Sequence, residues 1–141
     1  MLASKVPSPH ESLGSRLVDL LDGIEEPVSI ASAVRDRDGR LLDFRLEFVN
    51  QAAVAWAGVE RQAMVGLITG ELLPELRSSG YFDTLREVVE TGRPYHHDSA
   101  PVDDTVIGGA WVGGMYDMRA IRLGDGYLST WRRRAPVPEP A

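Results

Sequence analysis

The clearest pattern of hydrophobic and polar positions lies in residues 43–48, where every second side chain is apolar. The apolar positions are Phe44, Leu46 and Phe48, and the polar ones are Asp43, Arg45 and Glu47. Successive side chains of a strand point to opposite faces, so this period of two predicts a strand whose apolar positions all face the core and whose polar positions all face solvent. One covered face is typical of an antiparallel sheet.

A helical period precedes this strand. Residues 12–23 are predicted to form a short amphipathic helix, with Ser12 suited to its start and Gly23 to its end. Such a helix outside a sheet leaves apolar surface that needs a partner, which predicts a homodimer. The leucines expected in that interface are Leu13, Leu17, Leu20 and Leu21.

The strongest helical pattern spans Ser79–Thr91, and Gly92 and Pro94 are suited to end it. Its apolar residues share one face, so this helix is expected to lie across the sheet. They are Phe82, Leu85 and Val89, flanked by Tyr81 and Val88.

The period also changes at Asn50, where a strand is predicted to run directly into a short helix. Ala52, Ala53 and Trp56 fit one helical face, and the side chain of Asn50 is suited to accept a hydrogen bond from a first-turn amide. Replacing Asn50 by alanine is therefore expected to cost about 1 kcal/mol, the usual value of a helix cap.

The remaining strands are predicted as hairpins. A strand that begins after Pro27 turns at residues 36–40, and strands at residues 116–120 and 127–131 are joined by a turn at residues 124–126. Residues 103–114 are rich in glycine and are expected to form a hairpin loop. The order is helix, two strands, several short helices, a longer helix and about three strands, which is the α+β class.

Length and charge limit the number of domains and the classes of partner that the chain is expected to have. The chain has 141 residues, which fits one domain, and its formal net charge of -6 disfavours nucleic acid and anionic membranes as partners. Without a long apolar stretch or a leader pattern, it is expected to be cytoplasmic. The predicted organisation is a flexible tail at 1–11, one domain at 12–134 with its core at 27–132, and a proline-rich tail at 135–141.

Candidate chemistry is sparse. The chain has no cysteine, which excludes disulfides and thiolate metal sites. His96 and His97 are adjacent on a predicted strand and would point to opposite faces, which disfavours a two-histidine metal site. Asp103 and Asp104 lie in the glycine-rich loop, and no catalytic triad spacing is present, so the chain is predicted not to be an enzyme.

Short motifs in a fixed order carry a family resemblance. They are residues 20–28 (LLDGIEEPV), 38–40 (DGR), 48–53 (FVNQAA), 64–66 (MVG), 72–74 (LLP), 87–92 (EVVETG) and 123–126 (LGDG). From about Leu17 to Arg132 the chain resembles a PAS domain of bacterial signalling proteins. The resemblance implies a five-stranded antiparallel sheet of order 2-1-5-4-3, with helices over one face, and a sensory or regulatory role.

The resemblance leaves the cofactor and the output open. Photochemistry of the light-oxygen-voltage type needs a cysteine beside the flavin, which this chain lacks, whereas haem and non-covalent flavin remain open and neither is required. After Trp131 the sequence departs from the usual family ending, so a stand-alone protein and a fragment with a signalling output domain or partner protein are both compatible with it.

We expect a small, apolar ligand between the long helix and the sheet. Candidate lining residues are Trp56, Met64, Phe82, Leu85, Val89, Met118 and Thr130. One alternative is a filled core that acts only as a dimerisation or docking scaffold. A second is a small α+β barrel enzyme of the ketosteroid-isomerase type, which would need a buried carboxylate or histidine facing a cavity.

Overall fold

An antiparallel sheet organises the part of the chain that the computed structural model describes, residues 9–102, 106–107 and 110–134. Among these residues the sheet has five strands in the order β2-β1-β7-β6-β3, which confirms the predicted α+β class and sheet order. A separate two-stranded hairpin, β4-β5, lies within the predicted glycine-rich loop. The strands are β1 (Val28–Arg35), β2 (Leu41–Val49), β3 (Tyr95–Val102), β4 (Val106–Ile107), β5 (Ala110–Trp111), β6 (Gly114–Arg122) and β7 (Gly126–Arg133).

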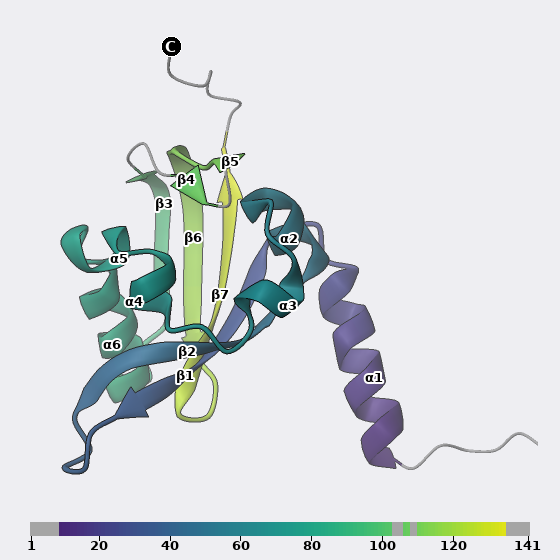
Figure 1. Cartoon of the computed structure of the whole chain (residues 1–141), viewed down its shortest axis with the longest axis horizontal. Helices are drawn as coiled ribbons and strands as arrows, with labels where there is room; N and C mark the ends of the chain where they lie inside the picture. The colour runs from purple at the N-terminus through teal and green to yellow at the C-terminus, as the bar shows by residue number, and fades with distance from the viewer. Residues whose placement is uncertain (1–8, 103–105, 108–109, 135–141) are drawn as a thin grey trace, which may run out of the picture.

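The helices divide into a covering layer and one outlier. They are α1 (Pro9–Asp22), α2 (Gln51–Ala57), α3 (Arg61–Met64), α4 (Thr69–Leu72), α5 (Glu75–Ser78) and α6 (Tyr81–Thr91). Helices α2 to α6 lie over one face of the sheet, whereas α1 stands apart beside α2 (Figure 1). The core fills the space between sheet and helices. At its centre the ring of Phe44 meets the rings of Phe82 and Tyr127, with centroids 5.5 and 4.9 Å away.

The ends of the chain are only partly described. Helix α1 begins at Pro9 instead of Ser12, since the fixed φ of proline suits the first helical position. The rest of the predicted N-terminal tail, the C-terminal tail from residue 135, and Asp103 and Asp104 lie outside the described residues. In the described part of the chain, no helix combines the length and hydrophobicity that crossing a membrane requires.

Strand β2 departs from the strict alternation that its sequence predicts. Phe44 and Leu46 are buried as expected, but Phe48 is only half-buried and Val49 is buried instead. The cause is a bulge: the strand partner steps by one residue, from Ile30 to Ala31, while β2 steps by two. The extra residue shifts the alternation of inward and outward side chains by one position, so Phe48 turns outward. There the guanidinium of Arg61 lies 4.9 Å from its ring centroid.

Asn50 caps α2, as predicted, and also ties α1 to the domain. Its Oδ1 accepts hydrogen bonds from the amides of Ala53, at 3.0 Å, and Val28, at 2.9 Å. Its Nδ2 donates to the carbonyl oxygens of Leu21, at 2.8 Å, and Glu26, at 2.9 Å. The side chain is fully buried. One amide therefore joins the end of α1, the start of β1 and the start of α2.

Both outer strands of the sheet are interrupted. Beside β2, Leu46 exchanges backbone hydrogen bonds with the following segment, donating to Leu67 O and accepting from Gly66 N. In β3 the register shifts between His97 and Ala100, and Ser99 has a positive φ of 58°. Neither edge is therefore a straight, open ladder.

Candidate functional site

A cavity of about 470 Å³ lies between the sheet and the helices that cover it. This volume is within the range of small-molecule sites, roughly 300–1,000 Å³. Its wall combines the helices α2 to α6 with the inward faces of β1, β2, β3, β6 and β7. Residues Ser78, Ser79, Gly80 and His97 line it and are exposed, so they mark its mouth between the start of α6 and β3.

The structure brings four of the seven predicted lining residues to this wall. Trp56 comes from α2, Met64 from α3, Leu85 from α6 and Met118 from β6. For these four residues, the periods read from the sequence agree with the face on which each side chain lies. Whether these residues bind a ligand remains a prediction.

The other three candidates lie outside the wall. Phe82 and Val89 are buried in the core, where the ring of Phe82 packs on that of Phe44. Thr130 is in register with Val28 and points to the opposite face of the sheet. Its neighbours Ser129 and Trp131 line the cavity instead. The sequence prediction therefore selected a residue from the wrong face of β7.

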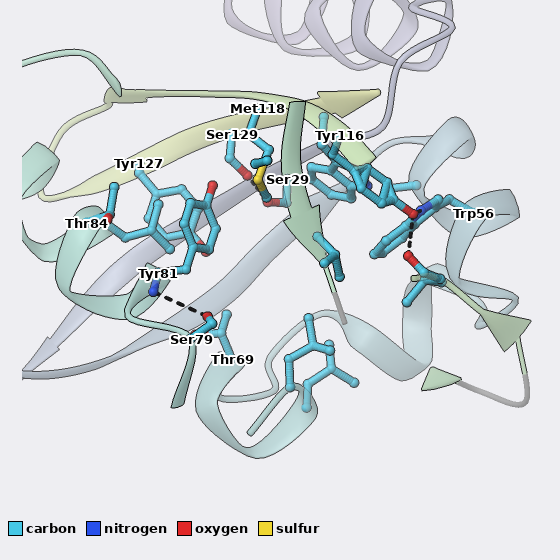
Figure 2. Close-up of a pocket in the computed structure, with 18 of the residues that line it drawn as sticks. Ser29, Trp56, Thr69, Ser79, Tyr81, Thr84, Tyr116, Met118, Tyr127 and Ser129 are labelled. Carbon is cyan, nitrogen blue, oxygen red and sulfur yellow. Dashed lines mark hydrogen bonds between the residues drawn. The ribbon is translucent and has the colours of Figure 1, made fainter. Parts of the chain in front are cut away.

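Aromatic side chains close both ends of the cavity, and sequence reasoning missed most of their roles. Figure 2 shows Tyr81 and Tyr127 together at one end and Trp56 beside Tyr116 at the other. The indole of Trp56 donates to the hydroxyl of Tyr116 at 2.9 Å and meets the ring of Trp131 at 5.0 Å between centroids. Tyr127, Ser129 and Trp131 occupy alternate positions of one predicted strand, and this shared face was the available signal.

Apart from His97 at the mouth, the polar side chains in the described wall are hydroxyls and indoles. Ser29 and Ser129 face each other across β1 and β7, with their hydroxyl oxygens 2.8 Å apart. Burial raises the pKa of Tyr127, a rise that the neighbouring Ser29 hydroxyl partly offsets, and burial likewise raises the pKa of Tyr81. Both phenols therefore stay neutral at physiological pH. Among the described side chains, Trp131 Nε1 is buried without a hydrogen-bond partner.

The two histidines separate as the strand geometry predicts. His97 lies at the mouth, with its Nδ1 3.1 Å from the hydroxyl of Tyr95, whereas His96 pairs with Asp98 at 2.8 Å and is not part of the wall. Among the described residues, no cluster of three or more His, Asp or Glu side chains is arranged to hold a metal ion. No Asp or Glu belongs to the described wall, and His97 is exposed, so the residues required by an isomerase-type site are not assembled there.

Asp43 fastens the helical cover to the sheet, contrary to the prediction that it faces solvent. Its side chain is 14% exposed and pairs with Arg77 at 2.8 Å. It also accepts from the amides of Phe44 and Gly70 and the hydroxyl of Thr69. Burial opposes ionisation of this carboxyl, but these donors outweigh burial and lower its pKa. A Cβ at Gly70 would lie 2.4 Å from Asp43 Oδ2, so the close approach requires glycine.

Comparison with known proteins places this architecture among PAS domains. A family model described as the PAS fold matches residues 27–126. A domain of a sensory box sensor histidine kinase/response regulator from Geobacter sulfurreducens has a TM-score of 0.61 and 18% identity, covering 92% of this chain and 100% of that one. The PAS domain of BvgS from Bordetella pertussis has a TM-score of 0.58 and 21% identity, covering 89% and 88%.

A PAS domain from Colwellia psychrerythraea gives a similar result, with a TM-score of 0.59, 12% identity, and coverage of 86% of this chain and 97% of that one. At these identities the solved structures establish the shared fold alone. The search of curated proteins gives no match.

Proposed function

The chain belongs to the PAS family, whose family model matches residues 27–126, and from this premise we propose that it is a non-catalytic sensory module that binds a small, uncharged, mainly apolar molecule. The cavity between α6 and the sheet carries the proposal. Its described wall contains no Asp, Glu, Lys or Arg, so a charged ligand would lose its hydration without gaining an ionic partner. Burial of a neutral ring system against the apolar and aromatic side chains of the wall is instead favourable.

The described connections supply a route from the cavity to α1. Ala53 and Trp56 line the cavity from α2, and the first turn of that helix is held by Asn50. Asn50 in turn holds the end of α1, where Asp22 also pairs with Arg61. A displacement of α2 by a ligand would therefore act on α1. We propose that α1 is the element through which the module relays its signal.

A pairing role for α1 is supported by its exposed leucines. Leu13, Leu17 and Leu20 are 56%, 48% and 60% exposed, whereas Leu21 is half-buried next to the domain. Three large apolar side chains on one isolated helix favour coverage by a second copy of the chain. Homodimerisation through α1 is therefore proposed together with ligand binding. A scaffold that dimerises without a ligand is the alternative.

The test compares two tryptophan substitutions on the same helix. Leu85→Trp fills the cavity, because Leu85 belongs to its wall, whereas Phe82→Trp enlarges a buried residue outside it. Each should overpack the core by about 1–3 kcal/mol. Native mass spectrometry of protein purified from cells is expected to show a small-molecule adduct in the wild type and in Phe82→Trp but not in Leu85→Trp. Equal adducts in both variants would place the ligand elsewhere, and no adduct in any form would favour the scaffold.

A further inference from the structure

The inward face of β7 presents a row of hydrogen-bond donors to the cavity. Tyr127, Ser129 and Trp131 occupy alternate positions of this strand, so their side chains share one face. Figure 2 shows Ser129 beside Ser29 on the sheet side of the cavity, with Tyr127 toward the α6 end. Most of the surrounding wall is apolar. These donors can therefore orient a ligand by hydrogen bonds, in addition to the fit of its shape.

The Ser29–Ser129 pair cannot use both of its hydroxyl protons internally. Two hydroxyls in mutual contact share one hydrogen bond, which uses one proton and leaves the other for a further acceptor. Both serines are buried, at 7% and 5% exposure, so bulk water does not readily supply that acceptor. The adjacent Tyr127 hydroxyl can accept from Ser29, but it brings a proton of its own, so an open chain of the three hydroxyls still leaves one proton without an acceptor.

Trp131 adds a second unmatched donor on the same face. An indole N–H can only donate, and that of Trp131 is buried without a partner in the described structure. The nearby hydroxyl of Tyr116 is already occupied: it accepts from Trp56 Nε1 and Arg133 Nε and donates to Val112 O. One hydroxyl proton and the indole N–H of Trp131 are therefore left without an acceptor on this side of the cavity.

From these unmatched donors we propose that the Ser29–Ser129 pair is the polar anchor of the cavity and that it recognises a neutral ring compound bearing a hydrogen-bond acceptor, such as a ketone, flanked by Trp131. The inference rests on the proposed function, since it requires a ligand in this cavity. An anionic acceptor is disfavoured because the described wall has no Lys or Arg to balance its charge. A ring fits because aromatic side chains lie at both ends.

Two probes of the same shape separate the anchor from simple apolar binding. 2-Acetylnaphthalene has a carbonyl where 2-isopropenylnaphthalene has a C=CH2 group, so only the first accepts a hydrogen bond. With the full chain, we expect both to bind and the ketone to bind about tenfold more tightly, the equivalent of one net hydrogen bond. In the Ser29→Ala/Ser129→Ala double variant, the two Kd values should move toward each other through weaker ketone binding.

The double variant removes both partners of one hydrogen bond, a change that is usually close to neutral for folding. Thr84→Val is the matched control, because Thr84 also lines the cavity but its hydroxyl donates to Gly80 O in its own helix. That variant should keep the tenfold ketone preference. Wild-type protein gives a further readout, since the indole N–H resonance of Trp131, one of three tryptophans, should move further with the ketone than with the alkene.

The outcomes distinguish the two proposals. Equal Kd values for both probes in the wild type, or a ketone preference unchanged in the double variant, would overturn the anchor while leaving apolar binding intact. Failure of both probes to bind or to move any indole resonance would overturn the proposed function, and the anchor with it.

Discussion

Replacing Asn50 by alanine tests how α1 is held to the domain. If the side chain only capped α2, its loss would cost about 1 kcal/mol of unfolding free energy. The structure shows four close hydrogen bonds from a fully buried amide, of which the cap to Ala53 N is one. A net contribution of about 0.5–1.5 kcal/mol for each, with partial rescue by water, gives an expected loss of about 3–5 kcal/mol.

Chemical denaturation measures this loss of unfolding free energy. Two further variants distinguish the buried network from a simple cap. Asn50→Asp keeps an acceptor for Val28 N and Ala53 N but directs a carboxylate at the carbonyl oxygens of Leu21 and Glu26. It should therefore also be destabilised by several kcal/mol, which a simple cap would not predict. Gln51→Ala, an exposed neighbour in the same helix, should change stability by no more than about 0.5 kcal/mol.

Hydrogen exchange locates the effect. In Asn50→Ala, the amides of Gly23 and Ile24, which bond to carbonyls in the last turns of α1, should exchange faster than in the wild type. A loss near 1 kcal/mol with unchanged exchange at these amides would show that Asn50 acts as a cap alone. The proposed route from the cavity to α1 would then lose its main connection.

Three further predictions follow from other parts of the structure. Asp43→Asn should destabilise the protein by about 1–2 kcal/mol at pH 7: the folded-state pKa of Asp43 is lowered, so its contribution is present above the unfolded pKa, near 4, and is lost as pH falls through the folded pKa. Denaturation at pH 7 and pH 3 should show this difference shrinking, whereas Asp83→Asn, at an exposed pair, should show little effect at either pH. Leu17→Glu should shift sedimentation toward monomer at high micromolar concentration, and an unchanged dimer would exclude α1 as its interface. Phe44→Ala should cost about 3–5 kcal/mol and Phe48→Ala about 1 kcal/mol in denaturation, because only the first is fully buried; equal costs would contradict the bulge in β2.

The periodic parts of the fold could be predicted because local chemistry determines them. The helices at α1 and α6, the cap at Asn50 and the turn at residues 124–126 each depend on neighbours within a few positions. Their joint order then resembled a known family. The α+β class followed from the order of the elements and the strand order from that resemblance, and both agree with the structure.

The errors arise where distant parts of the chain meet. The outward turn of Phe48 depends on a bulge against β1, which no local pattern in β2 reveals. The burial of Asp43 depends on donors that come from α4 and α5, more than twenty residues away. The error at Thr130 had a different origin. Tyr127 and Trp131 lie at alternate positions of one strand, so the sequence already indicated that Ser129, between them, shares their face and Thr130 does not.

The interrupted edges of the sheet have a consequence for association. Exposed, straight strand edges invite other chains to extend the sheet, which is a common route to aggregation. Here the segment after α3 occupies part of the β2 edge through Leu46 and Leu67, and in β3 the amide of Ser99 turns inward to Asp117. Strand addition therefore finds no continuous template at these positions. A partner has to recognise side chains on the surface, so a substitution that straightened the Ser99 bulge would create a new aggregation risk without touching the cavity or α1.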